Sequence, residues 1–124
     1  MAKKLIYVAE DDLAYSRVYK SKLESEGFDV VIIVEGEKVI PALKKKRPDL
    51  LVLDLIMPGK NGFEILQEIR ASQKLKNLKV IIASNLSQES DQDRAKKFGI
   101  TDFFVKADVS VMEMVAKIKN SLKA

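Results

Sequence analysis

A run of apolar residues that ends in one carboxylate and is soon interrupted by Pro and Gly constrains the fold most strongly. The run is Leu50-Leu51-Val52-Leu53-Asp54, and Met57-Pro58-Gly59 follows it. Four consecutive apolar residues bounded in this way are typical of a strand buried on both faces. Pro48 biases the residue before it toward an extended conformation and so separates the strand from a preceding helix. We expect Asp54 at the C-terminal end of a central strand, with a turn or helix-cap aspartate as the alternative.

Length and composition predict one globular domain over residues 1–124. The 124 residues are 47% hydrophobic and 32% charged, which is typical of a globular protein with a single core. The chain has no Cys, so it has no disulfide framework or thiolate metal site, and we expect a cytoplasmic protein. It has no His, so any chemistry must rely on carboxylates, lysine, hydroxyls or a metal. The apolar run Leu5 to Ala9 is too short for a signal peptide or a membrane span.

The net charge of +4 does not by itself indicate a nucleic-acid partner. The basic residues are scattered, and most fall near the ends of predicted helices, where cations complement the helix dipole. A nucleic-acid site would need basic and aromatic residues interleaved on one face, or a recognition motif, and the sequence offers neither. We expect no direct contact with nucleic acid and none with a membrane.

Strand and helix patterns alternate along the whole chain. Strands are predicted at Lys4 to Ala9, Phe28 to Val34, Leu50 to Asp54, Val80 to Ala83 and Phe103 to Val105. Helices are predicted up to about Glu26, from about Gly36 to Arg47, from Phe63 to about Ser72, from about Gln88 to Phe98, and at the C-terminus. The inward faces are predicted as Ala14, Tyr15, Val18, Tyr19 and Leu23 in the first helix, Phe63, Leu66 and Ile69 in the third, and Val111, Val115, Ile118 and Leu122 in the last.

Two of the predicted helices are unusual. Pro41 lies inside the second one and removes a backbone donor, so we expect that helix to be kinked or to start late. The helix from about Gln88 to Phe98 has Ala95 and Phe98 as almost its only apolar residues. We expect it to be the helix that is displaced most easily.

Five strands, each followed by a helix, predict an α/β fold with a doubly wound parallel sheet. Right-handed crossovers place helices on both faces of such a sheet, whose strands should be apolar throughout. A closed barrel would need eight strand–helix units, so we expect an open (βα)5 fold with strand order 2-1-3-4-5.

Polar residues stand where four of the predicted strands end. Glu10 and Asp11 follow the first strand, Asp54 ends the third, Ser84 ends the fourth and Lys106 follows the fifth. In an open α/β sheet ligands bind at the carboxyl ends of the strands, so these groups should converge. Taken singly, the acidic run Glu10 to Asp12 also suits a helix N-terminus. Ser84 alone could equally be a strand-end or turn residue, and Lys106 alone could be a solvated surface lysine.

Three close carboxylates beside one lysine retain excess negative charge, which favours a bound cation. An oxygen-only set of ligands selects a hard ion such as Mg²⁺, and Mg²⁺ commonly shares its coordination with phosphoryl oxygens. Asp54 is then either a ligand only or the nucleophile that forms an aspartyl-phosphate. Ser84 would donate a hydrogen bond to a phosphoryl oxygen, and Lys106 would neutralise its charge.

Over essentially its whole length the sequence resembles a response-regulator receiver domain of two-component signalling. The resemblance rests on Glu10 and Asp11, on Asp54 in the run Asp-Leu-Ile-Met-Pro-Gly-Lys-Asn-Gly, and on Ser84, Phe103 and Lys106. It implies that Asp54 accepts a phosphoryl group from a histidine kinase or phosphotransfer protein. It also implies that Glu10, Asp11, Asp54 and the backbone carbonyl of Ile56 hold Mg²⁺, and that Ser84 and Phe103 act as a switch.

The sequence departs from the family pattern after the lysine. Ala107 stands where the family usually has a Pro preceded by a cis bond. A cis bond before a residue other than Pro is unfavourable by about 3–4 kcal/mol, so we expect Lys106–Ala107 to be trans. The resemblance also places Ile56 and Leu86 beside the approach of a hydrolytic water. Both are bulky and apolar, which predicts a long-lived phosphorylated state.

Three functions of different classes fit the sequence to different degrees. The first is a phosphoacceptor switch, which modifies itself, is not a turnover enzyme and is read by a downstream protein or effector domain. The second is an interaction module without phosphorylation, against which the complete set of site residues argues. The third is a flavin-binding electron carrier, but the acidic loop after the first strand does not suit a flavin phosphate. The sequence leaves open whether the chain acts alone or belongs to a longer regulator or hybrid kinase.

Overall fold

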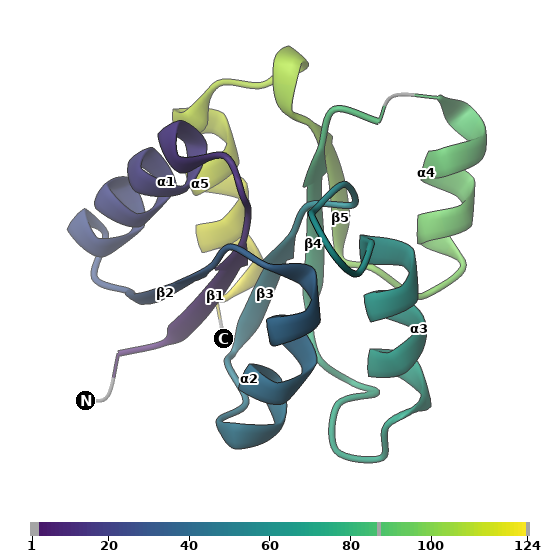
Figure 1. The fold of residues 1–124 in the computed structure, drawn as a ribbon. Helices are drawn as coiled ribbons and strands as arrows, with labels where there is room; N and C mark the ends of the chain where they lie inside the picture. Colours follow the sequence, from purple (N-terminus) through teal and green to yellow (C-terminus); the bar gives the residue numbers. More distant parts are fainter. Residues whose placement is uncertain (1–2, 87, 124) are drawn as a thin grey trace.

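The computed structural model describes residues 3–86 and 88–123, in which five strands alternate with five α-helices (Figure 1). The strands are β1 (Leu5–Ala9), β2 (Asp29–Ile33), β3 (Leu50–Leu53), β4 (Val80–Ser84) and β5 (Asp102–Val105). The helices are α1 (Leu13–Ser25), α2 (Val39–Lys45), α3 (Gly62–Ala71), α4 (Glu89–Lys96) and α5 (Val111–Ser121). In this part of the chain no helix is both long and apolar enough to cross a membrane.

The strands form one parallel sheet in the order β2-β1-β3-β4-β5, as the sequence predicted. The strands are in register near their C-terminal ends: Ala9 pairs with Leu53, Leu53 with Ile82, and Ser84 with Val105. Residues that directly follow β1, β3 and β5 therefore emerge at one edge of the sheet.

The sheet separates two apolar cores. Helices α1 and α5 cover one face, and α2, α3 and α4 cover the other (Figure 1). Every residue of β3 and β4 is buried, as expected for strands with helices on both sides. Strand β2 differs, because Asp29 and Val31 are exposed. The reason is its position: β2 is an edge strand and is covered less completely.

The predicted inward face of α1 was partly wrong. Ala14 and Val18 are exposed, whereas Ser16, Tyr19 and Leu23 are buried. The buried residues of α1 follow one another at spacings of three and four, as on one face of a helix. The pattern is hard to recognise in the sequence because one of its members, Ser16, is polar. The Ser16 hydroxyl tolerates burial because it donates a hydrogen bond to the Leu13 carbonyl at 3.3 Å.

The second helix starts late, as predicted from Pro41. A 3-10 turn at Gly36–Lys38 precedes it, and the α-helix proper begins at Val39. Pro41 therefore lies in the first turn, where its missing N–H has no intrahelical partner to lose. Gly36 permits this entry, because a Cβ there would lie 1.9 Å from the carbonyl oxygen of Lys60.

Helix α4 is held mainly by contacts other than apolar burial. Ala95 is its only buried residue. Beyond its C-terminal end, Arg70 of α3 donates hydrogen bonds to the carbonyls of Phe98 at 2.5 Å and Gly99 at 3.2 Å. The Arg94 guanidinium lies 3.9 Å from the centre of the Phe63 ring. The helix is thus anchored to α3 by Arg94 and by the segment that follows its C-terminal end.

We expect the amides of α4 to exchange hydrogen faster than those of α5. Helix α5 buries Met114, Val115 and Ile118, whereas α4 buries Ala95 alone, so opening α4 exposes less apolar surface. Hydrogen exchange followed by mass spectrometry or NMR measures the difference. Equal protection of the two helices would contradict this view of α4.

Candidate functional site

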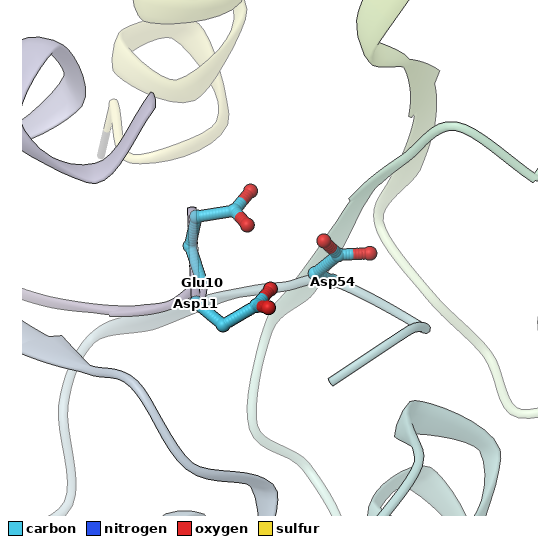
Figure 2. Close-up of side chains that lie close together, drawn as sticks. All are labelled: Glu10, Asp11 and Asp54. Carbon is cyan, nitrogen blue, oxygen red and sulfur yellow. The ribbon is translucent and has the colours of Figure 1, made fainter. Parts of the chain in front are cut away.

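The backbone places Glu10 and Asp54 side by side at the C-terminal edge of the sheet. The amide of Asp54 donates to the Ala9 carbonyl at 3.0 Å, and the amide of Glu10 donates to the Ile33 carbonyl at 2.9 Å. These bonds continue the parallel ladders one residue beyond the ends of the strands. Figure 2 shows the two side chains and that of Asp11 projecting toward a common space.

The three acidic residues form a compact cluster. One oxygen each from Glu10, Asp11 and Asp54 lie within 4.8 Å of one another. Glu10 and Asp54 are buried, and Asp11 is exposed, so the cluster opens to solvent on the Asp11 side. Asp12 behaves differently, because its Oδ1 accepts the Ala14 amide at 2.9 Å and caps α1. The helix-cap alternative is therefore correct for Asp12.

The Lys106 ammonium joins the two buried carboxylates. Its Nζ donates to Glu10 Oε1 at 2.5 Å and to Asp54 Oδ2 at 2.9 Å. Burial raises the pKa of Glu10 to about 7, and the hydrogen bonds from Lys106 and the Asp12 amide offset only part of this effect. Burial alone would lower the pKa of Lys106, but its bonds to Glu10 and Asp54 raise that pKa above its ordinary value.

The donors of the cluster suit a hard divalent cation. Three carboxylates face one ammonium, so two negative charges lack a partner when all the groups are ionised. Glu10 Oε2 and Asp54 Oδ1 each accept one backbone amide at 3.1 Å, from Asp12 and Ile56 respectively. A carboxylate oxygen can accept a further ligand, and an all-oxygen set is what Mg²⁺ and related ions prefer.

The loop after β3 turns back sharply beneath Asp54. The Gly62 amide donates to the Leu55 carbonyl at 2.9 Å. A Cβ on Gly62 would lie 2.6 Å from the Leu55 Cα, so only glycine fits there without movement. The Ile56 amide is held on Asp54 Oδ1, and the Ile56 side chain is 56% exposed at the rim of the site.

Three other predicted site residues lie on β4, just after it and within β5: Ser84, Leu86 and Phe103. Ser84 is fully buried at the end of β4, and its Oγ accepts the Leu86 amide at 3.3 Å. Leu86 and Phe103 are half-buried and pack against the core beneath α3 and α4. Within residues 3–86 and 88–123, no hydrogen bond joins Ser84 to the four charged residues.

Sequence reasoning missed two residues that contact the Lys106 segment. The Tyr15 ring centre lies 4.6 Å from Lys106 Nζ. Asn85 Oδ1 accepts the amide of Ala107 at 3.1 Å. The Lys106–Ala107 bond is trans, as expected, and Ala supplies an N–H that Pro would lack. The spacing of residues along the sequence predicts neither contact, because each one joins residues that lie far apart in the chain.

The model of the response regulator receiver domain matches residues 6–119. The chain belongs to the response regulator receiver family. The strand order agrees with the fold that the sequence predicted for such a domain.

Individual relatives cover this receiver domain almost completely. The phosphate regulon transcriptional regulatory protein PhoB of Rhizobium meliloti (strain 1021) is 34% identical over 118 residues, which are 95% of this chain and 52% of that protein. The Mn²⁺-bound form of response regulator Rcp1 is 26% identical with a TM-score of 0.86, covering 94% of this chain and 92% of that one. The phosphorylated cyanobacterial phytochrome response regulator RcpA is 26% identical with a TM-score of 0.84, covering 97% and 91%. The chain spans about half the length of the curated relatives it matches.

Replacing Lys106 by Met should destabilise the metal-free receiver domain in a pH-dependent way. At about pH 7.5 we expect the free energy of unfolding to fall by about 3–5 kcal/mol, the usual loss when a buried ion pair loses one partner. The loss should be smaller at about pH 5.5, where Glu10 can take up a proton. Urea denaturation at both pH values, with a chelator present, measures the effect.

The wild-type protein has its own pH trend from Glu10. Its folded pKa of about 7 exceeds the ordinary 4.5, so the folded state holds a proton that the unfolded state has lost between these values. This group therefore lowers stability as the pH rises through that window.

Lys38→Met is a matched control for the Lys106→Met variant, because Lys38 forms an exposed ion pair with Glu35. An equal loss for Lys106→Met at both pH values would point to packing rather than unpaired carboxylates.

Proposed function

We propose that this receiver domain is a phosphoacceptor switch in which Asp54 takes a phosphoryl group from a phosphohistidine donor. The observation that carries the proposal is the placement of one buried carboxylate at the end of the central strand β3. Asp54 Oδ2 lies 2.9 Å from the Lys106 ammonium, and Asp54 contributes to the acidic cluster with Glu10 and Asp11. The family assignment supports the same role.

The chemical step is a displacement at phosphorus. A carboxylate oxygen of Asp54 forms a bond to phosphorus while the bond from phosphorus to the donor nitrogen breaks, and the product is an acyl phosphate on Asp54. The bonding electrons leave with the donor nitrogen. Lys106 then compensates the charge that the phosphoryl oxygens bring into the buried site. The protein modifies itself and does not turn over a substrate as an ordinary enzyme does.

The acidic cluster is proposed to hold Mg²⁺ through Glu10, Asp11, Asp54 and the backbone carbonyl of Ile56. Bound there, the ion would neutralise negative charge on the phosphoryl oxygens. The exposure of Asp11 supports this assignment, because it gives a hydrated ion a route into the cluster. A solved relative, response regulator Rcp1, is described in an Mn²⁺-bound form, which also favours a divalent ion.

The conformational response is proposed to run through Ser84 and Phe103. Ser84 Oγ accepts a bond from the Leu86 amide, which leaves the hydroxyl proton available for a phosphoryl oxygen. Movement of Ser84 toward the phosphoryl group would vacate space that the half-buried Phe103 ring can enter. Helix α4 follows Ser84 in the chain and buries little apolar surface, so it is the element most easily displaced.

The proposed partners are a histidine kinase or phosphotransfer protein and a downstream target. Relatives such as PhoB are named as transcriptional regulators and are about twice as long as this chain. A downstream protein or an effector domain would read the altered surface. We place the domain in the cytoplasm, a location that suits a chain without Cys.

Phosphorylation is expected to add one phosphoryl group, on Asp54 alone. Incubation with acetyl phosphate and Mg²⁺ should produce a single adduct in intact-mass measurements. The adduct should vanish in Asp54→Asn and in the presence of a chelator, since Asp54 is the carboxylate at the end of β3 beside Lys106. Asp49→Asn is a matched control, because Asp49 lies at the opposite end of β3 and accepts the Leu5 amide. An unchanged adduct in Asp54→Asn would refute the assignment.

The phosphorylated state is expected to be long-lived for this family. Hydrolysis needs a water in line with phosphorus, and Ile56 and Leu86 cannot hold such a water by hydrogen bonds. Phosphate release from the purified phosphoprotein measures the lifetime. Ile56→Asn combined with Leu86→Glu should shorten the lifetime by roughly tenfold, the order of one positioned hydrogen bond. An unchanged decay rate would show that these two positions do not set the lifetime.

A further inference from the structure

The Lys106 ammonium has a third neighbour besides the two carboxylates that it joins. The centre of the Tyr15 ring lies 4.6 Å from Nζ, which is within the range of a cation–π contact. Building on the function proposed above, we propose that Tyr15 is a positioning residue for phosphotransfer, whose ring face holds the Lys106 ammonium beside Asp54.

The Tyr15 ring is a fixed support rather than a mobile surface group. Tyr15 lies in the first turn of α1, where its amide donates to Oδ1 of the N-cap residue Asp12 at 3.3 Å. The side chain is half-buried and packs against the core beneath α1 and α5. Tyr19, one turn later and 2% exposed, packs against it with ring centres 5.8 Å apart. The cap and the buried ring together restrict where the Tyr15 ring can lie.

The surroundings of Lys106 make the ring contact effective. The Lys106 side chain is only 5% exposed, so water competes little for its ammonium. Cation–π contacts are stronger for desolvated cations than for exposed ones. The ammonium is thus held from three directions, by Glu10, by Asp54 and by the face of the Tyr15 ring.

The ring contact differs from the other two because it uses no oxygen acceptor. When phosphorus bonds to Asp54, negative charge moves onto the phosphoryl oxygens, and Nζ must turn toward them. Glu10 opposes this movement, because it binds Nζ at 2.5 Å, closer than Asp54 does. A cation can turn between acceptors above a ring face without leaving it. The Tyr15 ring can therefore keep Nζ near Asp54 while its hydrogen bonds change, and no proton has to move.

The backbone of Lys106 is fixed separately, which leaves only the end of the side chain to be positioned. Asn85 Oδ1 accepts the Ala107 amide at 3.1 Å and ties this segment to the loop after β4. The main chain then sets where the lysine stem begins, and the carboxylates and the ring set where the ammonium lies.

The contact can be tested without any phosphodonor. We would record the NMR resonances of the Lys106 side chain in the metal-free wild type and in Tyr15→Phe and Tyr15→Leu. A ring face above the ε-methylene and ammonium shifts their proton resonances upfield. We expect the shift in the wild type and in Tyr15→Phe, which keeps the ring, and its loss in Tyr15→Leu. No difference among the three proteins would overturn the proposal.

The consequence for the reaction is tested by phosphorylation rates. With acetyl phosphate and saturating Mg²⁺, we expect Tyr15→Leu to lower the maximal rate of adduct formation roughly three- to thirtyfold, the range that cation–π energies imply. Tyr15→Phe should restore most of the rate. Val18→Ala, on the exposed side of α1, is the matched control and should change neither the rate nor the Lys106 resonances. If Tyr15→Leu does not fold, Tyr15→Met serves as the ring-free variant.

The outcomes separate this proposal from the function on which it is based. A wild-type protein that acquires no phosphoryl group would refute the proposed function, and the Lys106 resonances would still decide whether the ring holds the ammonium. A wild-type rate in the ring-free variant, alongside a slow Lys106→Met, would leave the function standing and overturn the role of Tyr15. Slow phosphorylation in both the Phe and the Leu variants would show that the tyrosine hydroxyl matters instead of the ring, which also overturns it.

Discussion

The buried ammonium of Lys106 is the interaction on which the rest of the site depends. It joins Glu10 and Asp54, which precede it by 96 and 52 residues, in a region that little water reaches. Buried charges are unfavourable unless they are paired, so the three groups require one another. Replacing them by apolar residues would often stabilise such a region. Buried ionisable groups with perturbed pKa values, such as these, cluster at functional sites in proteins.

The parallel sheet brings Glu10, Asp54 and Lys106 together. Because all five strands run in one direction, the residues that follow β1, β3 and β5 emerge at the same edge. The register of β1 with β3 places Glu10 next to Asp54, and β5 brings Lys106 from the other side. The strands β3 and β4 are completely buried, so this part of the site rests on strands that helices cover on both faces.

The two sides of the sheet differ in how firmly they hold their helices. The side with α1 and α5 includes the Tyr15–Tyr19 pair and contributes a fixed ring to the Lys106 ammonium. On the other side α4 buries only Ala95 and is anchored through Arg70 and Arg94. The structure thus combines a firm support on one side of the sheet with a weakly buried helix on the other.

The sequence by itself determined the order of strands and helices, the central position of β3 and the convergence of Glu10, Asp11, Asp54, Ser84 and Lys106 at one edge. These features follow from local apolar patterns and from the geometry of parallel strands, so they could be predicted without coordinates. The late start of α2 also followed from a local cause, because Pro41 restricts only its own turn. Tertiary structure alone decided which stripe of α1 is buried, since packing against the sheet sets the rotation of a helix. It also decided that Tyr15 meets Lys106 and that Asn85 meets Ala107, because these contacts join segments whose approach depends on the whole sheet.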